Sequence, residues 1–174
     1  MNNKYDVIII GAGAAGMMSA IEAGKRGRKV LLVDHYKKIG EKIRISGGGR
    51  CNFTNINTNP SKFLSQNPKF VRSALSQYTQ NDFINLMNKY EIKFHEKKLG
   101  QLFCDHSAQQ IVEMLLKECE LANVTILKEF IIKNVDKDND QYLVSTETDK
   151  YSSESLIIAT GGLSVPKIGA TSFG

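Results

Sequence analysis

Two glycine-rich segments contain the residues of this sequence that could hold an extended anionic ligand. The first, Gly11-Ala12-Gly13-Ala14-Ala15-Gly16, directly follows the apolar run Val7–Ile10. Glycines at this spacing allow a tight turn, a close approach of the backbone to a pyrophosphate, and close packing of the next helix on the strand. The N–H groups at the start of that helix also favour phosphate. The segment therefore predicts a dinucleotide site, and the alternative is a glycine-rich turn with no ligand.

The second segment is Ser46-Gly47-Gly48-Gly49-Arg50-Cys51-Asn52. Consecutive glycines let the backbone touch a flat or anionic ligand and adopt left-handed angles. The Ser46 hydroxyl, the Arg50 guanidinium and the nearby Lys42 can bind phosphate or carbonyl oxygens. Because ordinary NAD-binding folds do not need such a loop, we expect a second contact surface for a cofactor that carries a flavin ring; a structural turn is the alternative. We expect Cys51 to be a buried packing residue, because no resolving cysteine is near.

The elements that position these segments follow from periodicity. The continuous apolar run Val7–Ile10 is typical of a strand buried in a parallel sheet. We expect a helix from Ala14 to about Arg26 and a second strand over Val30–Val33. Asp34 ends that strand, where a carboxylate can accept hydrogen bonds from ribose hydroxyls.

Further elements are expected along the rest of the chain. Helices are predicted over Lys69–Tyr78 and Asn81–Tyr90. A hairpin is predicted over Lys93–Cys104, with its turn at Leu99-Gly100. A further helix is expected to open with a capping box of Ser107 and Gln110 and to end at about Leu121. Strands are predicted over Val124–Leu127, Phe130–Val135, Gln141–Thr146 and Leu156–Ala159. We divide the chain into a βαβ start with the second glycine segment (1–55), a helical and hairpin excursion (56–122), and a β-meander with a final strand (123–174).

Composition excludes several classes of function. The chain has 174 residues, of which 41% are hydrophobic and 24% charged, with a net charge of +5 from scattered lysines. This composition predicts a globular domain that binds a small molecule, with no nucleic-acid partner and no membrane segment. Three cysteines without a CxxC pair fit a reducing cytoplasm. No metal site is expected, because Asp136, Asp138, Asp140 and Glu147 lack the glycine that a calcium loop needs.

Three stretches resemble a known family. The string from Gly40 to Asn55 is similar to the signature of the YhiN-type, or BaiN-like, NAD(P)/FAD-dependent oxidoreductases, also called aminoacetone-oxidase-like. Leu99–Asp105 with Ser107–Gln110 resembles the middle motif of that family. Ile157-Ile158-Ala159-Thr160-Gly161-Gly162-Leu163-Ser164, with Pro166, resembles its second flavin motif.

The resemblance implies an α/β fold, a Rossmann-like FAD-binding domain of the glutathione-reductase type with an antiparallel β-meander and a helical excursion. By position, Gly11, Gly13, Ala15 and Gly16 would hold the pyrophosphate and Asp34 the adenosine ribose. The flavin end would lie along Lys42, Ser46, Gly47, Gly48 and Arg50, the adenine at the backbone near Ile131 and Ile132, and Thr160, Gly161 and Gly162 would close over the dinucleotide. Ala12, Ala14, His35, Gly49, Cys51 and Asn52 complete the predicted cofactor-binding set.

The implied function is hydride transfer between FAD and a small organic substrate, with NAD(P)H as a candidate electron donor. The sequence assigns no catalytic residue. Family members are longer than this chain, so we expect the substrate residues beyond Gly174. Two alternatives stay open at this point, an NAD(P)-binding Rossmann protein without flavin and a non-catalytic truncated remnant.

Overall fold

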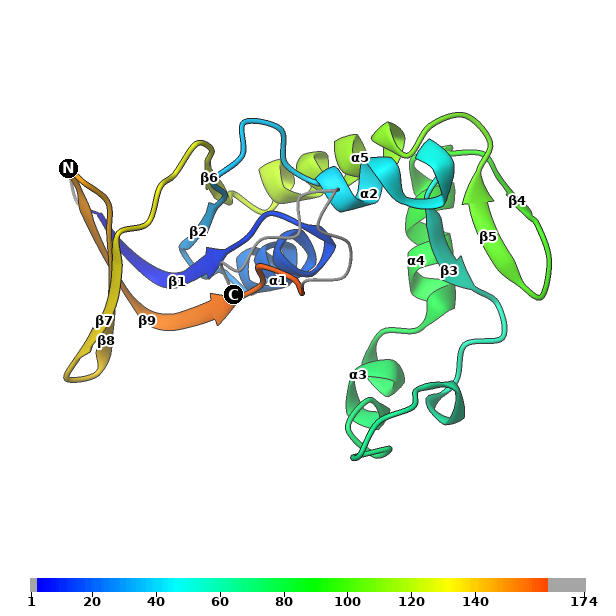
Figure 1. Cartoon of the computed structure of the whole chain (residues 1–174), viewed down its shortest axis with the longest axis horizontal. Coiled ribbons are helices and arrows are strands. Elements are labelled where there is room, and N and C mark those ends of the chain that lie inside the picture. The colour runs from blue at the N-terminus through cyan, green and yellow to red at the C-terminus, as the bar shows by residue number, and fades with distance from the viewer. Residues whose placement is uncertain (1–2, 163–174) are drawn as a thin grey trace. The chain divides into compact units, whose positions relative to one another are not determined.

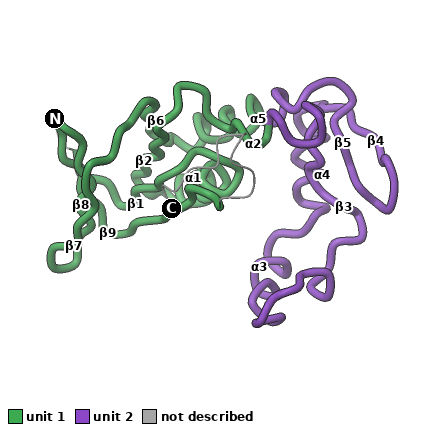
Figure 2. Tube along the Cα trace, in the orientation of Figure 1, with its two compact units in different colours: residues 1–43, 112–174 green, residues 44–111 purple. Residues whose placement is uncertain are grey.

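The computed structural model describes residues 3–162. The chain forms two compact units, one of Met1–Ile43 with Val112–Gly174 and one of Arg44–Ile111 (Figure 2). Each unit has a sheet of its own, and each is described separately below.

A six-stranded mixed sheet is the centre of the first unit, in the order β6-β2-β1-β9-β8-β7 (Figure 1). Its parallel part consists of β6 (Thr125–Leu127), β2 (Val30–Val33), β1 (Lys4–Ile10) and β9 (Lys150–Ile158). In register, Val7–Ile10 pairs with Val30–Val33. Parallel neighbours end at the same edge of a sheet, so the loops after β1, β2 and β9 emerge together.

Helix α1 (Ala14–Lys25), predicted from Ala14 to about Arg26, packs on this sheet and buries Met17, Ala20 and Ile21. Its Gly24 lies against the residue that follows α5 (Gln109–Leu121), since a Cβ at Gly24 would be 2.4 Å from the Ala122 carbonyl oxygen. A second core cluster contains Ile8, Ile10, Leu31, Val33, Phe130 and Val144. Buried apolar side chains on both sides of β1 explain its uninterrupted apolar run.

The antiparallel part of the sheet consists of β7 (Asn134–Asp138) and β8 (Gln141–Ser145), and β8 pairs with β9. The predicted strand over Phe130–Val135 is wrong in position. The Phe130 N–H donates to the Asp34 carbonyl oxygen at 3.0 Å, and its ring is buried in the core. This anchor holds Phe130 away from the ladder, and the strand begins at Asn134, which pairs with Ser145. Strand β9 begins earlier than predicted, because Lys150–Ser153 pairs with β8.

The second unit has a three-stranded antiparallel sheet in the order β3-β5-β4. The hairpin of β4 (Phe94–Glu96) and β5 (Gln101–Cys104) confirms the prediction, with positive φ at Leu99 and Gly100. Strand β3 (Asn52–Asn55), which was not predicted, pairs with β5. The unit also contains the end of α2 (Glu41–Ile45), the 3-10 turns η1 (Ser46–Gly49) and η2 (Pro60–Lys62), and the helices α3 (Arg72–Gln77) and α4 (Gln80–Lys89).

Helix starts in this unit differ from the prediction. The Asn67 side chain accepts a hydrogen bond from the Lys69 N–H, and this Asx turn delays α3 to Arg72. Phe70, which lies within the predicted helix Lys69–Tyr78, precedes α3 and is 79% exposed.

The predicted capping box of α5 is only half formed. The Ser107 hydroxyl accepts from the Gln109 N–H at 3.1 Å, so the helix begins at Gln109 and Gln110 is one residue too early to reach back. The Gln110 Oε1 atom has no hydrogen-bond partner among the described residues. A complete box exists instead at α4, between Thr79 and Asp82.

Candidate cofactor site

The loop between β1 and α1 is shaped by two glycines that the fold itself requires. Gly11 has a φ of +104°, and a Cβ there would lie 2.5 Å from the Ala159 carbonyl oxygen after β9. A Cβ at Gly16 would lie 1.8 Å from the carbonyl oxygen of Gly11. No side chain fits at either position, so both glycines serve the close approach of the helix and strands.

Gly13 has no such explanation within the chain. Its φ of −82° suits any residue, and a Cβ there would meet nothing within 4 Å. Among the described residues, no side chain caps α1 at Gly13, its first turn has no acidic residue, and Ala14 and Ala15 are exposed. An uncapped helix start with open space beside its first residues fits a pyrophosphate, which accepts hydrogen bonds from N–H groups and is favoured by the helix dipole.

Asp34 lies at the end of β2, beside this loop. Its Oδ2 atom accepts a hydrogen bond from the Ala12 N–H at 2.7 Å, and Oδ1 accepts from the Tyr36 N–H at 2.9 Å. The Nδ1 atom of His35 lies 3.5 Å from Oδ1. A carboxylate has about four lone-pair positions, so a ribose hydroxyl can still donate to it. The predicted ribose contact stays a prediction, and the structure adds a loop-holding role that the sequence did not indicate.

The end of β9 approaches the same loop. The Ala159 N–H donates to the Ile10 carbonyl oxygen at 2.8 Å. The Nζ atom of Lys42 donates to the Gly162 carbonyl oxygen at 2.8 Å. A Cβ at Gly161, where φ is +77°, would lie 3.2 Å from that Nζ. The structure thus joins two predicted parts of the site, Lys42 and the Thr160–Gly162 stretch; Leu163, Ser164 and Pro166 of the same motif lie outside the described residues.

The second glycine segment lies in the second unit and is strongly bent. Gly47, Gly48 and Gly49 have φ values of +57°, +68° and +86°. A Cβ at Gly47 would be 2.7 Å from the Phe103 ring, whereas nothing lies within 4 Å of one at Gly48. The Gly49 carbonyl oxygen accepts from the Ala108 N–H at 2.8 Å. The left-handed angles agree with the prediction, and the part of Ser46–Asn52 in cofactor binding stays a prediction.

Cys51 is buried, as expected, but one premise of that expectation is wrong. Cys104 is close in space, because the Cys104 N–H donates to the Arg50 carbonyl oxygen at 2.9 Å and the charge of Cys51 contributes to the pKa of Cys104. Burial is the main cause that raises the pKa of Cys104 to about 11 and also raises the pKa of Cys51. Both groups are therefore protonated thiols at neutral pH, which favours packing over redox chemistry.

Ile132 has a structural role in addition to its predicted one. Its side chain packs against the core cluster of the first unit, while Ile131 is 55% exposed. The predicted adenine contact concerns the backbone here and stays a prediction.

Within residues 3–162, no group of three or more His, Cys, Asp or Glu side chains is arranged to hold a metal ion. No helix in the same range is long and apolar enough to cross a bilayer.

Comparisons with known proteins agree with this geometry. Residues 5–174 match the family described as HI0933-like protein Rossmann domain. Over 171 residues, the chain is 55% identical to the ribosomal RNA dihydrouridine synthase of Escherichia coli, covering 98% of this chain and 43% of that protein. It is 48% identical to the Haemophilus influenzae protein of the same name, covering 100% of this chain and 44% of that protein. The chain thus spans less than half the length of these relatives.

Solved structures give the fold. The 3-ketosteroid-delta4-(5alpha)-dehydrogenase of Rhodococcus jostii RHA1 aligns with a TM-score of 0.64 at 12% identity, over 92% of this chain and 46% of that chain. The halogenase PltM, in a complex with phloroglucinol and FAD, aligns with a TM-score of 0.54 at 18% identity, over 89% of this chain and 34% of that chain. The uncapped start of α1 and the Asp34 carboxylate are compatible with a cofactor such as the FAD in that halogenase complex. The chain therefore belongs to the HI0933-like Rossmann domain family, and it has the fold of these solved structures, one of which contains FAD.

Proposed function

We propose that this chain is the FAD-binding part of an enzyme that reduces a uridine of ribosomal RNA to dihydrouridine. The observation that carries the proposal is the 55% and 48% identity, over nearly the whole chain, to two proteins named ribosomal RNA dihydrouridine synthase. A third relative, the 3-dehydro-bile acid delta(4,6)-reductase of Clostridium scindens, is only 24% identical over a similar length. The higher identity favours the RNA substrate over a small enone.

The reaction balances simply. The chemistry that FAD supplies when bound is hydride transfer, and reduction of the uridine C5–C6 double bond needs one hydride and one proton. A reduced nicotinamide, NAD(P)H, is the proposed source of the hydride. We assign no residue to deliver the proton, because this chain matches only 43% of the length of the Escherichia coli relative.

The residues of this chain bind and orient the cofactor in the proposal. The start of α1 at Gly13 holds the pyrophosphate with N–H groups, and Asp34 receives the ribose hydroxyls. Lys42 keeps the loop after β9 in place through Gly162 and adds a positive charge. Arg50, an exposed residue of the second glycine segment, is proposed to face the negative charge of the reduced flavin or the pyrophosphate.

The proposal departs from two expectations drawn from sequence, a small-molecule substrate and the lack of a nucleic-acid partner. Scattered lysines gave no sign of an RNA surface in the linear sequence. A cytoplasmic location, where ribosomal RNA is made in bacteria, remains part of the proposal.

The experiment is a reconstituted reaction. The full-length protein, loaded with FAD, is incubated with NADPH and unmodified ribosomal RNA, and nucleosides are then analysed by mass spectrometry for the gain of two hydrogens on uridine. We expect dihydrouridine at a defined position and none without NAD(P)H. A protein that consumes NADPH with a steroid enone but forms no dihydrouridine would support the bile-acid type of substrate. A protein that retains FAD but reduces neither would support a non-catalytic remnant.

A further inference from the structure

One segment of the second unit exposes large apolar side chains to solvent. Every residue from 61 to 70 is exposed, including Phe63 (41%), Leu64 (96%) and Phe70 (79%). We call residues 60–72 the η2–α3 segment, because they run from the η2 turn to the first residue of α3. Two exposed aromatic rings and an exposed leucine within one short segment indicate a surface that meets a partner.

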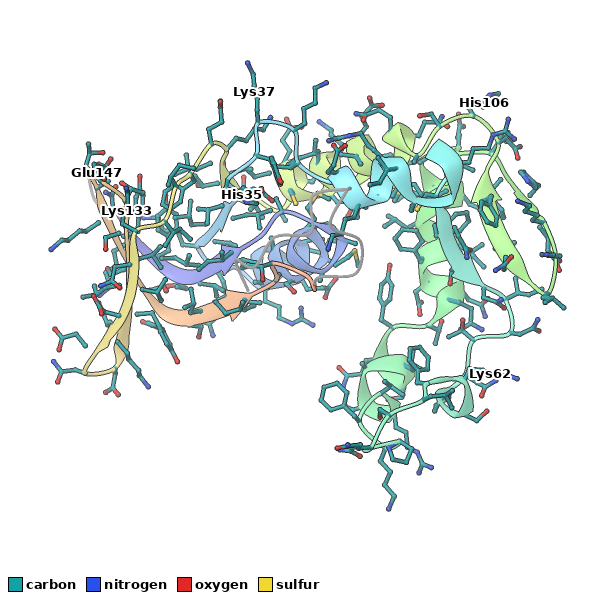
Figure 3. All side chains as sticks on the ribbon, viewed as in Figure 1. His35, Lys37, Lys62, His106, Lys133 and Glu147 are labelled. Atoms are coloured by element: carbon teal, nitrogen blue, oxygen red, sulfur yellow. The ribbon has the colours of Figure 1, made fainter. Side chains whose placement is uncertain are left out.

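The charge around these rings has a single sign. No aspartate or glutamate occurs between Glu41 and Asp82, whereas Lys62, Lys69 and Arg72 all lie in the η2–α3 segment. None of these three cations forms a salt bridge with any other residue that the structure describes. The Lys62 side chain extends away from α3 (Figure 3). The segment is therefore cationic and apolar at once, which matches a partner that is anionic and has flat apolar faces.

The backbone of the segment is fixed by local hydrogen bonds. The Asn59 side chain accepts from the Ser61 N–H at 3.0 Å, and the Asn67 side chain accepts from the Lys69 N–H at 3.2 Å. These two Asx turns stand before Phe63 and Phe70, so each ring follows a defined turn. A preformed platform loses less conformational entropy on binding than a flexible loop does.

We propose that the η2–α3 segment binds unpaired nucleotides of the ribosomal RNA substrate, with Phe63 and Phe70 stacking on bases and Lys62, Lys69 and Arg72 meeting phosphates. The inference rests on the proposed function, which supplies an RNA partner. Aromatic rings that stack on bases, set among cations that follow the backbone, are how proteins bind single-stranded nucleic acid. An enzyme that reduces a base also needs that base out of its stack, so unpaired RNA is its natural substrate.

A lipid surface fits the segment less well. Interfacial binding usually uses a long amphipathic helix, whereas α3 has six residues and the rings lie in turns before it. Segments such as those that the longer relatives contain beyond the matched residues are another class of occupant, but burial of the rings against them needs no excess of positive charge.

The test uses the full-length protein loaded with FAD and a labelled single-stranded RNA of mixed sequence, about 12 nucleotides long. Fluorescence anisotropy gives the dissociation constant over a series of salt concentrations. One variant combines Phe63→Ala with Phe70→Ala, and a second combines Lys62→Gln, Lys69→Gln and Arg72→Gln. The matched controls are Leu121→Ala, an exposed apolar residue at the end of α5, and Lys137→Gln, a strand lysine between Asp136 and Asp138.

We expect the double phenylalanine variant to bind RNA roughly tenfold or more weakly. The triple cation variant should lower the slope of log affinity against log salt by about 2, close to the value for three single-strand phosphate contacts. Both controls should bind as the parent does, and the visible FAD spectrum and thermal midpoint of every variant should be unchanged.

Several results would overturn the inference. One is RNA affinity that is unchanged in both variants or reduced equally in the controls. Another is a thermal midpoint that falls in the phenylalanine variant while RNA affinity stays constant, which would assign the rings to an internal contact. A third is binding to phosphatidylserine vesicles that depends on the rings while RNA binding does not. Dihydrouridine formation, measured in parallel, separates the two proposals. If the variants bind and modify RNA as well as the parent does, only this RNA-binding surface is ruled out. If the parent protein forms no dihydrouridine, the proposed function is ruled out.

Discussion

The Asp34 carboxylate at the end of β2 accepts a 2.7 Å hydrogen bond from the Ala12 N–H in the loop after β1. Because the two strands are parallel neighbours in register, their ends lie side by side. One carboxylate thus holds the glycine loop through one oxygen, and its lone pairs can accept further hydrogen bonds. Asp34 therefore stabilises the loop after β1, in addition to its predicted contact with the cofactor.

Replacing Asp34 with asparagine should weaken FAD binding roughly tenfold, a loss of about 1.4 kcal/mol. The carboxylate accepts from the Ala12 N–H with one oxygen and from the Tyr36 N–H with the other, whereas the asparagine amide has only one acceptor oxygen. The substitution also removes the negative charge. Quenching of flavin fluorescence on titration into apoprotein gives the dissociation constant. Asp140→Asn, at the exposed β7–β8 turn, is the control. Unaltered FAD affinity in the Asp34 variant would show that this carboxylate does not position the loop for the cofactor.

Two glycine substitutions in one loop should separate folding from binding. Gly16→Ala places a Cβ 1.8 Å from the Gly11 carbonyl oxygen, so it should destabilise the fold by at least about 3 kcal/mol. Gly13→Ala meets no atom within 4 Å, so apoprotein stability should change by less than about 0.5 kcal/mol while FAD affinity falls at least about tenfold. Urea unfolding of the apoprotein and FAD titration measure the two effects. If Gly13→Ala binds FAD normally, the pyrophosphate does not lie against this residue.

Lys42→Met should raise the FAD dissociation constant about fivefold, equivalent to about 1 kcal/mol. The substitution keeps the alkyl stem but removes the 2.8 Å hydrogen bond to the Gly162 carbonyl oxygen and one positive charge. Lys37→Met is the matched control, since Lys37 extends away from the ribbon before α2 (Figure 3). The measurement is the same titration at low and high salt. Equal effects in the two variants would point to overall charge rather than to the loop after β9.

The capping box of α4 should make a pH-dependent contribution to stability. The Thr79 hydroxyl and N–H donate to Asp82 and lower its pKa. Because the folded-state pKa is the lower one, the contribution is complete above the unfolded-state pKa of about 3.9 and is lost as pH falls through the folded value. Thr79→Ala should lower the free energy of unfolding at neutral pH and lower it less in acid. Chemical denaturation from neutral pH to below pH 3 checks this, and a cost that stays constant over that range would exclude the carboxylate.

The buried thiols should be unreactive in the native protein. Burial raises the pKa of Cys104 and of Cys119 to about 11. Iodoacetamide at neutral pH should therefore label neither residue until the chain is unfolded, when mass spectrometry should find all three cysteines modified. The unfolded chain releases these protons at lower pH than the folded one, so stability should fall as pH rises above the ordinary thiol value of 9.0. Rapid native labelling of Cys104 would show that the β3–β5 pair opens readily.

Local patterns in the sequence were sufficient for the elements around the cofactor. The apolar run before Gly11, the helix from Ala14 and the strand before Asp34 occur where their periodicity and glycine spacing predicted them. These signals are local, because burial on both faces of a strand and close helix packing each leave a mark within a few residues. The hairpin around Leu99-Gly100 was found in the same way, from the residues that a tight turn requires.

Contacts between distant residues were decided only by the tertiary structure. The hydrogen bond of Lys42 to Gly162 joins residues 120 positions apart, and the Phe130 N–H reaches Asp34 and thereby moves the start of β7. The proximity of Cys51 and Cys104 and the exposure of Phe70 likewise depend on packing between segments. A sequence pattern records which side chains can be buried and which turns can form, whereas partners across a sheet or between loops are selected by the free energy of the whole fold, which no single segment contains.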